Sequence, residues 1–451
     1  MNSFPFFRLS DQDSLTVPEG FTLEDWEGKT IYLRPYQREA VEVILQSASR
    51  TSSRFGLPSV VPGGFVQFAP GTGKTLTAFS AALLVSQLPG VKKAFYLVNR
   101  NGLNWRAVRN FERLENSFID LGLGIEKLLP AIHKPEIVLI PTTLQKLDVF
   151  MRSLRDFDSI KKHCVFIYDD CQSALNSDRK AIIERVFPNS QHYFFTSAAV
   201  PEFERSFCGE ELYSYTLSQA LKDENILPLQ IEYELNQNVR TRSGIPEVDA
   251  LNECRAMISP TRIHVIAKKI FKTISQKTEN QRFGSILAVE DELSAMNYYV
   301  ELLRQIRKTG RDLRIAAVYD STPKTRKTVV DRRRRDFWEL VTEDYNARFG
   351  TSFSSIGARF QEYVLDVSRR LTLGEIDLLL VVNPFLTSFT TANLNTLWLD
   401  CDISSDSLLQ AFSRINRLTT QKKAGNVVCF RDLRGQVKDV FPPEARILVR
   451  R

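Results

Sequence analysis

The feature that most constrains the fold of this chain is a short glycine-containing loop between two apolar runs. The segment FVQF ends at Phe68 and is rich in strand-forming residues, whereas the run that begins at Leu76 has the apolar content of a buried helix. The loop between them reads APGTGKT and contains Gly71 and Gly73. Strand, glycine loop and helix occur in this order in phosphate-binding loops. Phe68 stands where the usual motif has its first glycine, so a chance glycine loop is the alternative, which the flanking strand and helix disfavour.

The residue types in this loop suit a nucleoside triphosphate. Glycines let backbone N–H groups close around phosphate oxygens, and the N-terminus of the following helix adds partial positive charge. Lys74 supplies a full positive charge, and the hydroxyl of Thr75 can ligate Mg²⁺. We therefore expect Gly71, Thr72, Gly73, Lys74 and Thr75 to hold ATP or GTP together with magnesium.

Length and composition indicate an ordinary globular chain with two domains. At 451 residues it exceeds the size at which a single core keeps growing. The net charge of +7 favours a polyanionic partner only weakly, because the lysines and arginines are spread along the chain. Residues 332–335 are four consecutive arginines, which could grip a phosphate backbone, although a solvated run is the commoner outcome.

Neither a zinc site, a disulfide framework nor a membrane span is expected. The 6 cysteines form no CxxC pair, and the 4 histidines show no metal-ligand spacing. The longest apolar stretch, residues 376–386, is too short to cross a bilayer and is interrupted by Asn383 and Pro384. The N-terminal sequence MNSFPFFRLS lacks the basic region and long apolar core of a signal peptide. We expect a soluble protein of the reducing cytoplasm.

Alternation of apolar strands with helices indicates an α/β fold. Residues 1–30 have the composition of an irregular leader. One domain is expected over residues 31–235 and a second over 236–451, because the polar segment 236–246 resembles a domain junction. Without a hairpin signal, both domains should contain parallel sheets that are covered on both faces. The predicted strands are 65–68, 94–98, 136–140, 163–168 and 191–196, followed by 285–289, 315–319, 376–382 and 397–399.

Two acidic residues, Asp169 and Asp170, directly follow the predicted strand HCVFIY. In open α/β sheets, ligand contacts lie at the carboxyl ends of the strands. A nucleotidase needs one carboxylate there for magnesium and a second to activate water. An isolated acidic pair could equally cap the next helix, but the phosphate loop makes the functional interpretation the better one.

Four side chains, one near the start of the chain and three near its end, are further candidates for nucleotide contacts. Gln37 lies just inside a predicted helix, where its amide could read an adenine edge, with a solvated glutamine as an equal alternative. In QAFSRINRL, the spacing of Gln410, Arg414 and Arg417 is expected to put all three on one face of a helix that begins near Ser407. Such arginines suit the charge that develops in phosphoryl transfer, although an exposed basic stripe has the same pattern.

Taken in order, these segments resemble the superfamily-two helicases and translocases, and within them the motor portion of the restriction subunit of type I restriction enzymes. The likeness extends from Tyr32 to Phe430. LRPYQREAV looks like the adenine-reading Q motif, APGTGKT like Walker A, VFIYDDCQSA like the FDECHRS box and FFTSAA like FTGTP, and LLQAFSRINRL is similar to the family almost letter for letter. The resemblance implies two tandem RecA-like domains with an ATP cleft between them.

The resemblance also implies roles for individual residues. Lys74 would bind phosphates, Asp169 would coordinate Mg²⁺ and Asp170 would occupy the water-activating position. Arg414 and Arg417 would reach the nucleotide from the second domain. Members of this family hydrolyse ATP to pump double-stranded DNA, so a helicase-like DNA translocase of a restriction system is the function that the resemblance implies.

Several positions depart from the family pattern. Asp170 replaces a glutamate and is one methylene shorter, and a displacement of about 1 Å in a catalytic group can slow a reaction on the order of a hundredfold. Gln172 replaces a histidine, residues 197–199 replace GTP, and Ser388 and Thr390 replace the glycine and aspartate of LTGFD. The alternative is therefore a motor relic with impaired hydrolysis that binds ATP and DNA, or a partner protein, in a regulatory role.

The nuclease domain of the family precedes the motor, and only the leader, residues 1–30, does so here. We therefore expect a motor without its own nuclease. A separate nuclease, or modification and specificity subunits, would then supply the missing functions.

Overall fold

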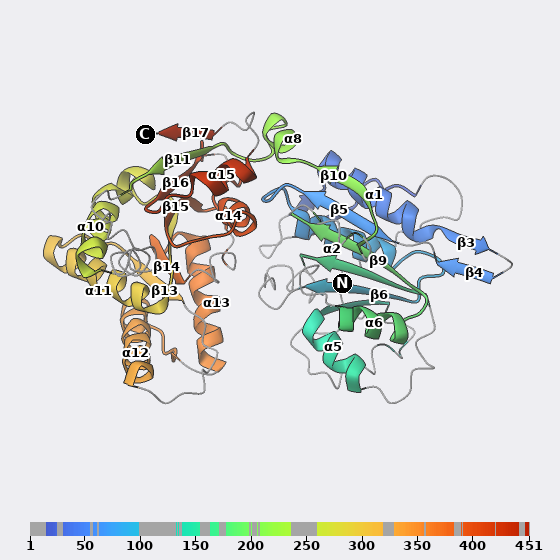
Figure 1. Cartoon of the computed structure of the whole chain (residues 1–451), viewed down its shortest axis with the longest axis horizontal. Coiled ribbons are helices and arrows are strands. Elements are labelled where there is room, and N and C mark those ends of the chain that lie inside the picture. The colour runs from blue at the N-terminus through green and yellow to red at the C-terminus, as the bar shows by residue number, and fades with distance from the viewer. Residues whose placement is uncertain are drawn as a thin grey trace, which may run out of the picture. The chain divides into compact units, whose positions relative to one another are not determined.

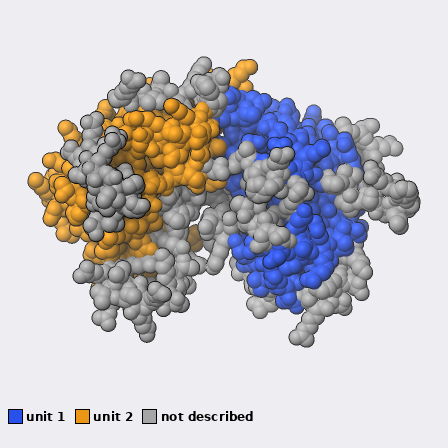
Figure 2. Space-filling view, in the orientation of Figure 1, with its two compact units in different colours: residues 1–220 blue, residues 221–451 orange. Residues whose placement is uncertain are grey.

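The computed structural model divides the chain into two compact units, Met1–Ala220 and Leu221–Arg451, coloured separately in Figure 2. Each unit is built around its own parallel sheet. The structure describes residues 15–24, 30–54, 57–60, 63–98, 132, 134, 138–153, 163–170, 177–197, 200, 205, 208–235, 259–318, 329–355, 358–382, 389, 391–419, 421–441 and 447–450.

The sheet of the first unit has six strands in the order β10-β5-β9-β8-β6-β7, and all neighbours are parallel (Figure 1). The strands are β5 (Gly64–Phe68), β6 (Lys93–Val98), β7 (Leu139–Thr143), β8 (Cys164–Asp169), β9 (Ser190–Thr196) and β10 (Glu210–Tyr215). The helices are α1 (Pro35–Ser49), α2 (Lys74–Val85), α5 (Leu144–Ser153), α6 (Ser177–Val186) and α8 (Leu217–Lys222). This order places the carboxyl ends of β5, β9 and β8 side by side.

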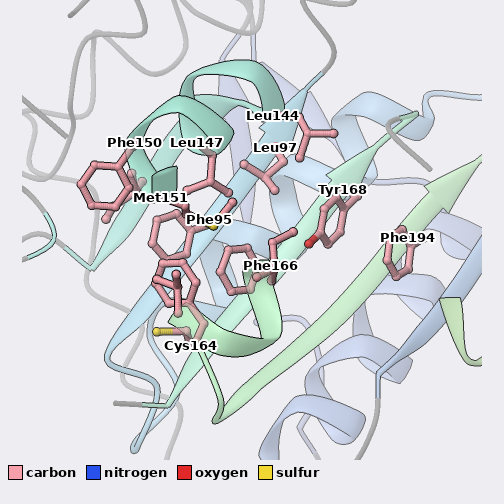
Figure 3. Packing of buried hydrophobic residues seen from close by; sticks show 14 of the residues in the cluster. Phe95, Leu97, Leu144, Leu147, Phe150, Met151, Cys164, Phe166, Tyr168 and Phe194 are labelled. Atoms are coloured by element: carbon pink, nitrogen blue, oxygen red, sulfur yellow. The ribbon is translucent and has the colours of Figure 1, made fainter. Parts of the chain in front are cut away.

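Helices cover both faces of this sheet, because successive strand residues point to opposite sides. On one face, Phe95 stacks on Phe166 with ring centroids 4.6 Å apart. Leu144, Leu147, Phe150 and Met151 of α5 complete this cluster (Figure 3). On the other face, the rings of Tyr96 and of Phe79 from α2 form a T-shaped pair, with ring centroids 5.9 Å apart.

The sheet of the second unit has seven strands in the order β13-β14-β12-β15-β16-β11-β17, again all parallel. The strands are β11 (Leu229–Tyr233), β12 (Gly284–Val289), β13 (Ile315–Val318), β14 (Leu378–Val382), β15 (Leu394–Asp400), β16 (Gly425–Cys429) and β17 (Ile447–Arg450). The helices are α10 (Pro260–Lys277), α11 (Glu292–Thr309), α12 (Val329–Phe349), α13 (Ala358–Leu373), α14 (Ser405–Phe412) and α15 (Arg434–Val440). The predicted α/β class with tandem parallel sheets is confirmed.

Several local features differ from the sequence expectation. Two short antiparallel ribbons, β1 (Thr22–Glu24) with β2 (Thr30–Tyr32) and β3 (Thr51–Arg54) with β4 (Leu57–Val60), were not expected, because strands of three or four residues carry little periodicity. The described part of the expected leader therefore contains a strand, and Val17 in it donates its N–H to Glu42 of α1 at 3.0 Å.

The boundary between the two compact units falls after Ala220, whereas the sequence suggested a junction after residue 235. β11 lies on the N-terminal side of that junction, yet it pairs with β16 and β17 of the second sheet. Just before β11, the Leu227 N–H donates a hydrogen bond to the Asn416 carbonyl at 2.7 Å, which also ties this segment to the second unit.

The remaining expectations concern cysteines, arginines and membranes. Cys164, Cys208, Cys401 and Cys429 are buried and free of disulfides. The arginine run lies in α12, and Arg335 is exposed. Among the described helices, none is both long enough and apolar enough to span a bilayer.

Candidate nucleotide-binding site

The phosphate loop lies between the end of β5 and the start of α2, as the sequence predicts. The Ala69 N–H donates to the carbonyl of Tyr215 at the end of β10, and the Thr72 hydroxyl donates back to the Ala69 carbonyl at 2.6 Å. Gly71 and Gly73 both have φ of 91°, a backbone conformation that glycine adopts without steric cost. Helix α2 begins at Lys74, so the positive end of its dipole faces the loop.

Lys74 reaches across the ends of the neighbouring strands to the two acidic residues. Its ammonium forms an ion pair with Asp170 and lies 3.7 Å from Oδ1 of Asp169. It also lies 3.5 Å from the hydroxyl of Ser197, which follows β9 and donates to Asp170 at 3.4 Å. The structure thus brings Lys74, Asp169 and Asp170 together at one edge of the sheet.

Asp169 is the most buried member of this cluster, with 5% of its side chain exposed. Burial raises the pKa of its carboxyl group, and the negative charge of Asp170 raises it further. The Lys74 charge and hydrogen bonds from Thr75 and Tyr96 act in the opposite direction. An additional cation stabilises the charged form of a buried carboxylate whose pKa is raised in this way, so the local electrostatics favour a bound metal ion.

The donor set near Asp169 fits magnesium. Mg²⁺ prefers hard oxygen ligands and is usually bound through one or two carboxylates together with substrate phosphates. The Asp169 carboxylate, at the end of β8, is hydrogen-bonded to the hydroxyl of Thr75 in the first turn of α2. These two groups could hold the ion beside a phosphate in the loop.

Asp170 adopts an uncommon backbone conformation. Its φ is 56°, in the left-handed region that aspartate tolerates better than most residues, and its N–H donates to the Phe195 carbonyl at 3.0 Å. The side chain is 38% exposed and is held between Lys74 and Ser197. It is therefore open to solvent while remaining fixed beside the loop.

Gln37 lies against the phosphate loop and is buried. Its amide donates to the Thr72 carbonyl at 2.9 Å and accepts the Arg34 N–H at 2.9 Å. The adjacent Tyr36 hydroxyl donates to the same Thr72 carbonyl at 2.6 Å. Gln37 thus fixes the loop, and an amide has one further donor and acceptor for an adenine edge. Adenine reading stays a prediction.

The prediction that Gln410, Arg414 and Arg417 share one face of a helix is wrong. Helix α14 ends at Phe412, so only Gln410 is helical, while Arg414 lies in the following turn and Arg417 beyond it. The Ser413 hydroxyl caps the helix by donating to the Gln410 carbonyl at 2.6 Å. The chain leaves the helical path after Phe412 because Ile415 is fully buried and the Asn416 carbonyl accepts the N–H of Leu227, just before β11.

Some predicted motif residues lie outside the described part of the chain. They are Gln172, residues 198–199, Ser388 and Thr390.

Family models match both units of the chain. A model described as SWI2/SNF2 ATPase matches residues 36–254, and one described as type I restriction enzyme subunit R domain 3 matches residues 281–432. The first includes the phosphate loop and both aspartates. By these two matches the chain is related to the superfamily-two ATPases and to the R subunits of type I restriction enzymes.

Curated relatives align with most of the chain. The chain is 28% identical over 432 residues to the endonuclease subunit of the type I restriction enzyme SauCOLORF180P of Staphylococcus aureus. It is 29% identical over 434 residues to that of SsaAORF53P of Staphylococcus saprophyticus. Each alignment covers 91% of this chain but 45% of the relative, so the chain spans about half the length of these proteins.

Two solved structures share the fold. An HsdR fragment of a type I restriction enzyme from Vibrio vulnificus has a TM-score of 0.57 at 14% identity, over 92% of this chain and 67% of that one. The Type ISP restriction-modification enzyme LlaBIII, solved bound to DNA, has a TM-score of 0.54 at 13% identity, over 90% of this chain and 28% of that one.

The sequence did not identify two tyrosines of this site. Tyr36 lies beside Gln37 in the first turn of the same helix, and that position was a usable signal. Tyr96 donates its hydroxyl to Oδ2 of Asp169 at 3.1 Å from the neighbouring strand, and sequence spacing carries no sign of that contact.

Gly73 should tolerate alanine less well than Gly90, although both have left-handed backbones with φ of 91° and 97°. An alanine Cβ at Gly73 would lie 2.4 Å from Nε2 of Gln37, whereas one at Gly90 meets nothing within 4 Å. Gly90→Ala should lower the free energy of unfolding by about 1–2 kcal/mol through backbone strain alone. Gly73→Ala should lower it by about 1 kcal/mol more, because the Gln37–Thr72 hydrogen bond is disturbed. Urea denaturation measures both, and equal losses would contradict the close contact.

Proposed function

We propose that this chain is an ATP-dependent motor that translocates on nucleic acid, with double-stranded DNA as its track. The observation that carries the proposal is the meeting of Lys74 with Asp169 and Asp170 at the edge of a parallel sheet. A cation at a helix N-terminus, facing two carboxylates, is the arrangement that phosphoryl transfer requires. The SWI2/SNF2 ATPase match over the same residues supports the assignment.

In the proposed mechanism, Lys74 exchanges its carboxylate partners for phosphate oxygens of ATP. Bound Mg²⁺ would supply positive charge to the phosphates, with Asp169 and Thr75 holding it. Asp170, partly exposed and steadied by Ser197, would orient the attacking water and accept its proton. Backbone N–H groups of the loop around Gly71 and Gly73 would bind the remaining phosphate oxygens.

The proposal keeps a role for the second unit in the same reaction. Arg414 and Arg417 would stabilise the charge that develops during phosphoryl transfer, and Gln410 would contact the nucleotide. Gln410 near the end of α14 and the two arginines that follow the helix lie close together in sequence, which suits a shared role even though the three do not share a helical face.

The relatives suggest the track and the partners. The curated relatives are named endonuclease subunits, and LlaBIII was solved bound to DNA. We propose that the aligned part is the DNA motor, and that nuclease, modification and specificity functions lie outside it. The net charge of +7 is favourable for a DNA track, and the free buried cysteines suit the cytoplasm.

A second candidate is a hydrolysis-impaired motor that binds ATP and DNA, or a partner protein, in a regulatory role. The observation in its favour is Asp170, which is shorter than the family's glutamate and is held by Lys74. Such a protein would bind ATP with little turnover.

Lys74→Ala should reduce DNA-stimulated ATP hydrolysis on the order of a hundredfold or more, because it removes the charge that binds the phosphates. Steady-state phosphate release with and without double-stranded DNA measures this. Lys222→Ala, an exposed lysine in the last turn of α8, is the matched control and should leave the rate unchanged. Equal rates in Lys74→Ala and wild type would refute an ATPase at this loop.

Asp170→Glu should raise turnover on the order of tenfold, because the longer side chain restores the reach of the general base. The same assay measures it under saturating ATP. If the rate is unchanged, the shorter carboxylate is not what limits hydrolysis. Tight ATP binding by the wild type without turnover, together with turnover in Asp170→Glu, would favour the impaired motor.

A further inference from the structure

Tyr96 belongs to the strand beside the one that ends in Asp169. It pairs in register with Ile167 of β8, and Asp169 lies two residues further along that strand, on the same face. Tyr96 is 1% exposed, and its ring forms a T-shaped pair with the ring of Phe79 from α2. The sheet and the helix therefore fix the ring, and the hydroxyl reaches along the strand to the carboxylate.

The two oxygens of the Asp169 carboxylate face different partners. Oδ2 accepts the Tyr96 hydroxyl at 3.1 Å, whereas Oδ1 lies 3.7 Å from the Lys74 ammonium. A carboxylate that rotated freely about its Cβ–Cγ bond would present either oxygen to a cation. Together with the Thr75 hydroxyl, which also hydrogen-bonds the carboxylate, the bond from Tyr96 favours the orientation with Oδ1 toward the phosphate loop.

We propose that Tyr96 is a positioning residue that sets the Asp169 carboxylate for its metal ion. This inference rests on the function proposed above. Groups that orient metal ligands commonly affect metal affinity by about 10- to 100-fold when they are removed. Because the hydroxyl acts on the carboxylate and not on the phosphate loop, its removal weakens the metal and leaves metal-free nucleotide binding unchanged.

Other buried tyrosines of the chain show what a purely structural hydroxyl looks like. Tyr193 lies on β9 of the same sheet and donates to the Ser47 hydroxyl at 3.0 Å. Tyr298 donates to Asp400 at 2.6 Å, but Arg262 also holds that aspartate through two nitrogens. The charged groups beside Asp169 are instead those of the phosphate-loop lysine, Lys74, and of Asp170.

The experiment compares Tyr96→Phe with Tyr193→Phe in the full chain. Both variants lose one buried hydroxyl from one sheet and keep the ring, so a loss of stability alone affects both in the same way. Mn²⁺ is the probe, and its dissociation constant is measured by electron paramagnetic resonance in the presence of a slowly hydrolysed ATP analogue. A fluorescent ATP analogue in excess chelator gives the metal-free nucleotide affinity.

The expected result is a Mn²⁺ dissociation constant about tenfold higher in Tyr96→Phe, with wild-type values in Tyr193→Phe and unchanged metal-free affinity in both. Equal Mn²⁺ affinity in all three proteins would overturn the positioning role while leaving the nucleotide site intact. A wild-type chain that binds no nucleotide at all would overturn the proposed function and this inference with it.

Discussion

The attraction between one ammonium and two carboxylates organises the first unit. Lys74, Asp169 and Asp170 come from a loop and a strand that are separated by about ninety residues of sequence, and only the parallel sheet brings them to one edge. Burial makes the charge of Asp169 costly, so Lys74 is an internal counter-ion in a place where a triphosphate and its metal would compete for the same groups. A bound triphosphate would therefore draw Lys74 away from its carboxylate partners.

The rest of the unit holds these charges in position. The strand order β5-β9-β8 sets the spacing of Lys74 from the aspartates, and the aromatic cluster beneath α5 and α6 fixes β8 within the sheet. On the loop side, Tyr36 and Gln37 hold the Thr72 carbonyl, and Gly73 lies so close to the Gln37 amide that a side chain would disturb the bond. Helix α1 is therefore part of the phosphate loop's support.

Sequence reasoning succeeded where a single local pattern determines the structure. The glycine loop, the aspartates after an apolar run and the buried strands of both sheets follow from composition and short-range order. It failed where a distant contact decides. α14 ends at Phe412 because Ile415 enters the core and Asn416 bonds Leu227, and β11 joins the second sheet through strands that follow it by about two hundred residues. The Tyr96 contact depends on strand register, which sequence spacing does not reveal.

The most direct test of the account is a crystal structure of the chain with Mg²⁺ and a slowly hydrolysed ATP analogue. The account predicts that Lys74 leaves Asp170 and contacts phosphate oxygens within the loop, and that the metal ion lies between Thr75, Asp169 and the phosphates. A nucleotide bound elsewhere on the chain, with Lys74 still paired to Asp170, would contradict it.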